Sequence, residues 1–326
     1  MRRPRVAAEW RLLAGAAIRL AVAQIVLRPA ADHLSRDFAG RIADLVGALS
    51  ARTPHGRRVA GEFERAFGAG SGARIAAGWF ARPFRDFAAL QQVARGRCLI
   101  EAWGVRERIP AAAERIRDSG SPYVVATGHF SREAVLHLYV PSAIPGRLST
   151  LVARLPGRSR HPAARRVRLQ CGTSLRAVAC VRPQTRFVYV REAGQAAEAL
   201  NELRRPEGAL LAAVDATAWR GPLVRPFAGR RSREFALGTA RLARLAGCPI
   251  LPCVPYLDDE GGVVLEWGEP IPPPARRDRL ADRDVTSAVL DVLEVGVGRR
   301  PDQYVVPTRG ERRWNPATAT WRDPAD

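Results

Sequence analysis

The 326-residue sequence contains no lysine, so all 52 of its basic side chains are arginines. This excludes mechanisms that use a P-loop lysine, a Schiff-base lysine or a protein-kinase strand lysine. Methionine occurs once, and heavy use of Ala, Arg and Gly is typical of a GC-rich genome. Such a genome explains why arginine is used in place of lysine. It does not explain why the 52 basic residues outnumber the 32 acidic residues. The resulting net charge of +20 predicts an anionic partner: membrane lipid, an acidic carrier protein or nucleic acid.

Cysteine is also scarce, and long apolar runs are missing. The five cysteines form no C-x-x-C pair, which argues against a disulfide framework and a zinc ribbon and favours buried thiols. No uncharged apolar run reaches the roughly 18 residues of a spanning helix, which excludes a multi-span membrane protein. With 47% hydrophobic and 26% charged residues, the composition is that of a folded protein with a sizeable core.

The N-terminal segment 1–35 is predicted to associate with a membrane. Its apolar stretch 10–27 has the character of a helix in which Arg11, Gly15 and Arg19 recur every four residues on a narrow stripe. A spanning helix would hold Arg19 near the middle of the bilayer, at a cost of about 2.5–3.5 kcal/mol. We therefore expect a helix lying in the membrane interface, with its arginines reaching lipid phosphates. A soluble packing helix is the alternative.

The rest of the chain divides by pattern into a helical part and a sheet-containing part. Residues 36–118 show helical periodicity broken by Gly and Pro. From residue 122, short apolar runs alternate with helical segments, as in an α/β fold. The predicted strands are 123–127, 148–152, 187–190, 209–214, 250–256 and 263–267. The predicted helices between them include 131–139, 195–203 and 232–246.

These patterns predict a single α/β domain over residues 36–315. Its helical part is 36–118, and its core at 119–315 contains a mixed, mostly parallel sheet flanked by helices. No linker long enough to divide this region is visible, and the segment 316–326 is predicted to be a loose tail.

A histidine at the end of a buried strand is the strongest chemical feature. The run Tyr123–Thr127 is followed by Gly128 and His129, and then a helix is predicted to begin. In open α/β sheets, ligands bind at the carboxyl ends of strands. Glu133 can accept a hydrogen bond from one ring nitrogen, while the other nitrogen takes a proton from a hydroxyl. No G-x-S-x-G elbow is present, which favours a general base over a partner of a protein nucleophile. A structural histidine is the alternative.

Several segments resemble, in the right order, the late lipid A acyltransferases of bacteria, a family of the lysophospholipid/glycerolipid acyltransferase superfamily. The segment at His129 resembles the family's His-x4-Asp/Glu motif, usually G-H-F-G-N-W-E. The resemblance covers roughly residues 10–313. The further blocks are 152–156 (Y-R-P), 208–229 (L-P-D-Q…G…V-x-F-F-G), 238–252 (G-x-A-R-L-A…G-A-P-V-V-P) and 300–304 (R-x-P-E-Q-Y).

The resemblance implies acyl transfer from an acyl carrier protein or coenzyme A thioester to a hydroxyl of a membrane glycolipid. The acceptor would be a lipid A precursor or a mannosylated phosphatidylinositol, at the cytoplasmic face of the bacterial inner membrane. His129 would be the base and Glu133 its partner; Arg154, Asp215 and Arg225 would bind substrate. The reaction needs no cofactor or metal, and the acyl thioester is a co-substrate. Expected partners are anionic lipid, the carrier protein and the glycolipid, with no nucleic acid.

Departures from the family pattern leave a second interpretation open. The spacing here is His129-x3-Glu133, as if one residue of the motif were deleted, and the family's Asp-Gln is Asp215-Ala216. A catalytically inactive relative that binds lipid or scaffolds a membrane assembly is therefore the alternative. Nucleic-acid binding rests only on the net charge, because the arginines are spread along the chain without a recognised binding motif.

Overall fold

The computed structural model describes residues 36–95, 104–130, 134–153, 162–190, 194–215, 221–260, 262–275, 278, 280–306 and 308–323. The predicted interface helix within 1–35 lies outside the described residues. Across the ranges above, no helix combines the length and the apolar character needed to cross a bilayer.

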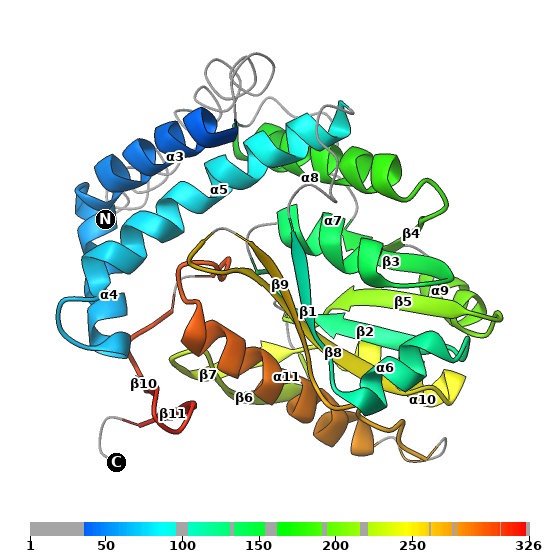
Figure 1. Ribbon diagram of the computed structural model, residues 1–326. Helices are drawn as coiled ribbons and strands as arrows, with labels where there is room; N and C mark the ends of the chain where they lie inside the picture. The colour runs from blue at the N-terminus through cyan, green and yellow to red at the C-terminus, as the bar shows by residue number, and fades with distance from the viewer. Residues whose placement is uncertain are drawn as a thin grey trace, which may run out of the picture.

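A seven-stranded sheet forms the centre of the molecule, with strand order β1-β9-β8-β2-β5-β3-β4 (Figure 1). Every neighbouring pair is parallel except β8 with β9, so the predicted mixed, mostly parallel sheet is confirmed. The strands are β1 Val105–Arg108, β2 Tyr123–Thr127, β3 Arg147–Ala153, β4 Arg186–Val190, β5 Gly208–Ala213, β8 Ile250–Leu257 and β9 Val263–Trp267.

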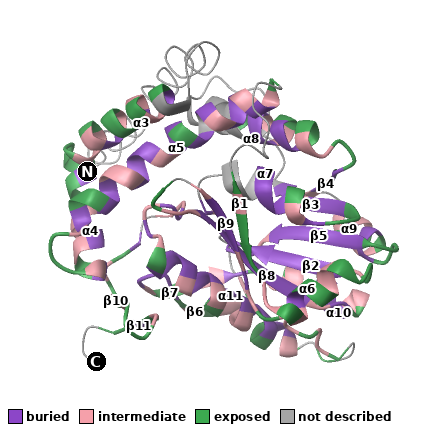
Figure 2. Ribbon diagram, in the orientation of Figure 1, coloured by how far each residue is buried: buried purple, intermediate pink, exposed green. Residues whose placement is uncertain are grey.

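Helices cover both faces of this sheet and bury two hydrophobic cores. Successive side chains of a strand point to opposite faces, so Val124 and Ala126 of β2 enter one core while Tyr123 and Val125 enter the other. One face is covered by α5 Gly72–Ala94, α6 Ala111–Asp118, α7 Ala134–Ala143 and α8 Pro162–Val181. The other is covered by α9 Gln195–Leu203, α10 Gly238–Ala246 and α11 Ala281–Arg299. Burial on both faces explains why the central strands are continuous apolar runs (Figure 2).

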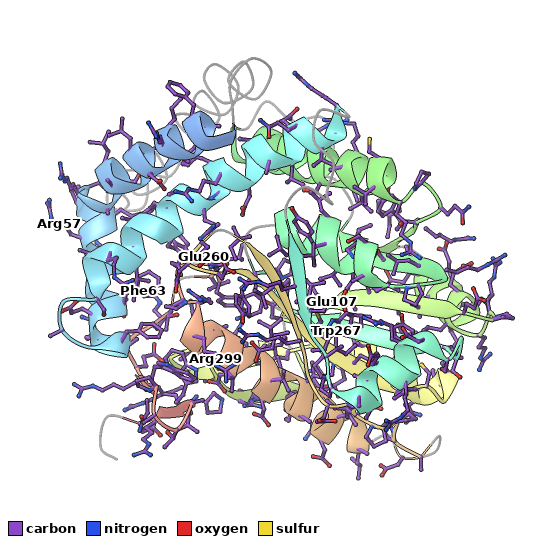
Figure 3. The ribbon with its side chains drawn as sticks, viewed as in Figure 1. Arg57, Phe63, Glu107, Glu260, Trp267 and Arg299 are labelled. Carbon is purple, nitrogen blue, oxygen red and sulfur yellow. The ribbon has the colours of Figure 1, made fainter. Side chains whose placement is uncertain are left out.

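Two further helices, α3 Arg36–Ala51 and α4 Pro54–Phe67, pack against α5 and extend the helical layer. Phe63 of α4 is fully buried in a small core shared with α5, whereas Arg57 lies on the exposed outer side (Figure 3). Thr53 caps the start of α4 by accepting a hydrogen bond from the Gly56 N–H at 3.0 Å.

Three segments differ from the sequence prediction. Strand β1 lies inside the part that was predicted to be helical. Its sequence Val-Arg-Glu-Arg carries almost no apolar periodicity, so no strand was predicted there. The predicted helix 232–246 is divided between β7 Arg230–Phe235, which pairs with β6 Leu223–Phe227, and α10. Within the predicted loose tail 316–326, β11 Thr320–Arg322 instead pairs with β10 Arg313–Asn315 in a hairpin, and its Trp321 ring is buried.

Candidate active site

Strand register brings His129 and Asp215 together at one edge of the sheet. Strands β2 and β5 are parallel neighbours with Thr127 opposite Ala213, and the Val214 N–H donates to the Thr127 carbonyl at 2.9 Å. Beyond this pair, the chain continues for two residues after each strand, which places His129 beside Asp215. The carboxyl ends of adjacent central strands are a common position for ligand sites in such sheets.

Two hydrogen bonds join His129 to the Asp215 carboxylate. The ring Nδ1 lies 2.6 Å from Oδ1, and the backbone N–H of His129 donates to Oδ2 at 2.9 Å. Gly128 makes room for this contact, because a Cβ there would lie 3.3 Å from Oδ2 and 2.9 Å from the Phe130 ring. The imidazole therefore has a fixed orientation relative to a carboxylate that comes from a different strand.

Tyr304 and Arg233 extend the His129–Asp215 pair into a chain of four polar groups. The Tyr304 hydroxyl donates to Asp215 Oδ2 at 2.7 Å and accepts from Arg233 Nη1 at 2.8 Å. Arg233 Nη2 also donates to the Asp215 backbone carbonyl. The Arg233 guanidinium lies over the Phe227 and Phe235 rings, 5.4 and 5.3 Å from their centroids. Two cation–π contacts and two hydrogen bonds thus fix the arginine beside the carboxylate.

The segment that carries Tyr304 is itself anchored on three sides. The Gln303 side-chain amide accepts from the Leu257 N–H at 2.8 Å and donates to the Leu257 carbonyl at 2.6 Å, at the end of β8. Trp79 of α5 donates from Nε1 to the Tyr304 carbonyl at 2.8 Å. The Val305 N–H donates to the His129 carbonyl at 2.9 Å. The helical layer and the C-terminal segment therefore both meet the site at this tyrosine.

The charges at the site favour an ionised aspartate beside an accessible imidazole. Burial alone raises the pKa of Asp215, but the His129 charge and the hydrogen bonds from His129 and Tyr304 outweigh it and lower that pKa to about 2. The side chain of Asp215 is 1% exposed and that of His129 is 35% exposed. With Nδ1 bound to Asp215, Nε2 is the nitrogen that can take a proton from a bound hydroxyl.

The structure brings together only part of the set of residues predicted from the sequence. His129 and Asp215 are in contact, whereas Glu133 and Arg154 lie outside the described residues. The sequence analysis expected a carboxylate, Glu133, on one ring nitrogen of His129; the structure shows the Asp215 carboxylate on Nδ1. Arg225 is held by α11: it donates to the Ser287 carbonyl at 2.9 Å and to the Asp291 carboxylate at 2.6 Å.

Sequence reasoning missed the roles of Tyr304 and Arg233, and the described residues add no metal site. Tyr304 stood in the R-x-P-E-Q-Y-like block and Arg233 in an arginine-rich run, but neither position reveals a contact with Asp215.

Across the described residues, no group of three His, Cys, Asp or Glu side chains is placed to hold a metal ion. Burial raises the pKa of Cys248 to about 12, so that thiol is no nucleophile.

Comparisons with known proteins add a weak likeness. No family model and no curated protein matches the sequence. Among solved structures, a similar chain is the 1-acyl-sn-glycerophosphate acyltransferase PlsC from Thermotoga maritima. It is 14% identical, with 83% of this chain and 99% of that chain covered, and the TM-score is 0.39. These values are too low to assign a function to the chain.

Proposed function

We propose that this protein is an acyltransferase that uses His129 as its general base. It would move a fatty acyl chain from an acyl carrier protein or coenzyme A thioester to a hydroxyl of a membrane glycolipid. The observation that carries the proposal is the His129–Asp215 pair, 2.6 Å apart at the carboxyl ends of β2 and β5. The ordered motif resemblance to the late lipid A acyltransferases supports the same reaction.

In the proposed reaction, Nε2 of His129 takes the proton of the acceptor hydroxyl while its oxygen forms a bond to the thioester carbonyl carbon. Asp215 stabilises the imidazolium that results, because its carboxylate is ionised and bonded to Nδ1. The tetrahedral intermediate then breaks its carbon–sulfur bond, and the departing thiolate receives the proton from His129. The products are an ester and a free thiol, and no cofactor enters the balance.

Asp215 also bears on the shortened His129-x3-Glu133 spacing. If the partner of the base is Asp215, from a neighbouring strand, the local spacing no longer decides whether the base is oriented. This favours an active enzyme over the alternative of an inactive relative that binds lipid.

We propose that the protein works at the cytoplasmic face of a bacterial inner membrane. The net charge of +20 suits anionic lipid and an acidic carrier protein, and segment 1–35 would lie in the interface. The acceptor would be a lipid A precursor or a mannosylated phosphatidylinositol.

The test is acyl transfer by membranes carrying the full chain, with labelled acyl carrier protein or acyl-coenzyme A and a panel of glycolipid acceptors. His129→Ala should lower the rate about 10²–10⁴-fold. Asp215→Asn should cause a comparable loss, whereas Glu133→Gln should leave most of the rate. His55→Ala, on the exposed side of α4, controls for loss of an imidazole elsewhere.

Two outcomes would contradict the proposal. Transfer that survives His129→Ala would remove its base, and absence of transfer to every acceptor by folded wild type would favour the lipid-binding relative. A loss with Glu133→Gln but not with Asp215→Asn would keep the acyltransferase and reject Asp215 as partner of the base.

A further inference from the structure

Arg233 of β7 extends its guanidinium into the candidate site, where it reaches Tyr304 and the Asp215 backbone. Its side chain is partly buried, whereas that of Arg231, two residues earlier on the same strand, is 66% exposed. The guanidinium lies over two ring systems, those of Phe227 and Phe235, which are both fully buried. Aromatic faces attract cations through their partial negative charge. The positive charge of Arg233 therefore has a fixed place beside Asp215.

The groups that accept from Arg233 are both neutral. Nη1 donates to the Tyr304 hydroxyl at 2.8 Å, and Nη2 donates to the backbone carbonyl of Asp215. Neither acceptor neutralises the guanidinium, and charges at partly buried positions interact more strongly than they do in bulk water. The charge of Arg233 consequently acts on the Asp215 carboxylate, which lies on the other side of the Tyr304 hydroxyl.

The hydrogen bonds from Arg233 to Asp215 can run in only one direction. A guanidinium has donors and no acceptor, so the Tyr304 oxygen must accept from Arg233. Burial and the charge of Asp215 raise the pKa of Tyr304 well above its ordinary value, so the hydroxyl keeps its single proton. That proton is donated to Oδ2 of Asp215 at 2.7 Å. The arrangement therefore requires Asp215 to be an acceptor, as an ionised carboxylate is.

The two oxygens of the Asp215 carboxylate have different partners. Oδ2 accepts from Tyr304 and from the backbone N–H of His129 at 2.9 Å, whereas Oδ1 lies 2.6 Å from Nδ1 of the ring. Because an ionised carboxylate can only accept, the neutral imidazole must carry its one proton on Nδ1. The other nitrogen, Nε2, is then the basic one. The donors on Asp215 thus determine which nitrogen of His129 can act as the base.

We propose that Arg233 and Tyr304 are positioning residues for the reaction: they keep Asp215 an acceptor whose Oδ1 bonds Nδ1 of His129, so that Nε2 is left without a proton. Neither residue touches the reacting atoms in this role. That the base serves acyl transfer rests on the proposed function, but the protonation of His129 does not. Among the described residues, the Asp215 carboxylate contacts two titratable side chains, His129 and Tyr304, and the Arg233 charge stands behind the second.

The first measurement is nitrogen NMR of the imidazole rings in the full-length protein, labelled with isotopic histidine and held in detergent micelles. His129→Ala identifies the signals of His129 among the five histidines. The variants are Arg233→Gln, Arg233→Lys and, independently, Tyr304→Phe. Arg231→Gln is the matched control, because it removes an exposed arginine of the same strand. Thermal melting establishes that each variant is folded.

In the wild type, the neutral ring of His129 should carry its proton on Nδ1. Arg233→Gln removes a positive charge beside the His129–Asp215 pair, and Tyr304→Phe removes a donor that disperses the charge of Asp215. Both changes favour the imidazolium, so each should raise the pKa of His129. Arg233→Lys keeps the charge and should raise that pKa less, and Arg231→Gln should leave it unchanged.

The second measurement is the pH profile of kcat/KM in acyl transfer. A base with a raised pKa is protonated over more of the pH range, so the acidic limb should move to higher pH in Arg233→Gln and Tyr304→Phe. At neutral pH, kcat/KM should fall about 10–100-fold, as expected when a hydrogen bond to a charged group is lost. The limb should stay in place in Arg231→Gln.

A merely structural role would lower the melting temperature and the rate without moving the pKa of His129 or the acidic limb, and would overturn the proposal. A neutral wild-type ring with its proton on Nε2, or an equal shift with Arg231→Gln, would do the same. If the NMR results are as expected but acyl transfer survives His129→Ala, the positioning role stands and the proposed function fails. If His129→Ala abolishes transfer but Arg233→Gln and Tyr304→Phe leave the pKa of His129 unchanged, the proposed function stands and the positioning role fails.

Discussion

The Tyr304 hydroxyl is the part of the site whose contribution can be measured without knowing the substrate. Tyr304→Phe removes one oxygen atom and leaves the ring, which lies 5.4 Å from the Phe130 ring and 6.1 Å from the Phe227 ring. The lost hydroxyl donates at 2.7 Å to Asp215, a fully buried carboxylate. Hydrogen bonds to charged groups contribute about 1.5–3 kcal/mol, so we expect a loss of about 2 kcal/mol in the free energy of unfolding.

Tyr123→Phe is the matched control for this substitution. The Tyr123 hydroxyl is buried and has no hydrogen-bond partner among the described residues, so its removal should leave stability unchanged or slightly increased. Urea unfolding of the two variants and the wild type gives both differences. A Tyr304→Phe variant as stable as Tyr123→Phe would refute the assignment of an ionised carboxylate bonded to this tyrosine. The variant should also raise the pKa of Asp215, because a donor to its charged form is lost.

Three other predictions concern Asp215, a buried ion pair and a glycine turn. The lowered pKa of Asp215, about 2 against an ordinary 3.8, gives stability that is present above pH 3.8 and lost as the pH falls through 2. The stability difference between wild type and Asp215→Asn should therefore shrink by about 2 kcal/mol from pH 4 to pH 2, measured by urea unfolding; a constant difference would contradict this pKa. Arg244→Ala leaves the Asp282 carboxylate, 1% exposed and bonded at 2.8 Å, without its partner, and should cost about 3–5 kcal/mol in chemical unfolding; a loss under about 1 kcal/mol would show that water reaches the aspartate. Gly229→Ala introduces a Cβ that would lie 2.2 Å from the Arg309 carbonyl at a backbone φ of 79°, and should lower the melting temperature by several degrees; an unchanged melting temperature would contradict that close approach.

The central strands of the sheet were predictable because both of their faces are buried. Strand β5, Gly208–Ala213, is buried on both faces, so its side chains form a continuous apolar run that marks the strand in the sequence. Strand β1, Val105–Arg108, lies at the sheet edge with three of its four residues exposed, and it leaves no such run. The arginine-rich β7 was missed because it too lacks an apolar run. Its pairing with β6 is a contact between two segments, which the sequence of neither segment reveals.

The candidate site was predictable only where one strand carried it. The order of strand, glycine and histidine selected His129, and the resemblance to the family's L-P-D-Q block implied Asp215 as a separate substrate-binding residue. Their pairing depends on β5 lying beside β2 in the sheet, although β3 and β4 come between them in the chain, and local sequence does not specify this. The sequence analysis therefore named only Glu133, the nearest carboxylate along the predicted helix, as a partner of the histidine, and it did not find the contact with Asp215, 86 residues away.

The C-terminal segment that carries Tyr304 contributes to the electrostatic environment of Asp215 and His129. Asp215 is buried and bonded to the Tyr304 hydroxyl, and the segment carrying Tyr304 is attached to β8 through Gln303 and to α5 through Trp79. A carboxylate buried without these donors would have its pKa raised and would lose the charge that orients the imidazole. The base at the end of β2 thus acquires its electrostatic environment from three distant parts of the chain. Substitutions at Gln303 or Trp79 should then affect His129 through Tyr304 and Asp215, without touching either ring nitrogen.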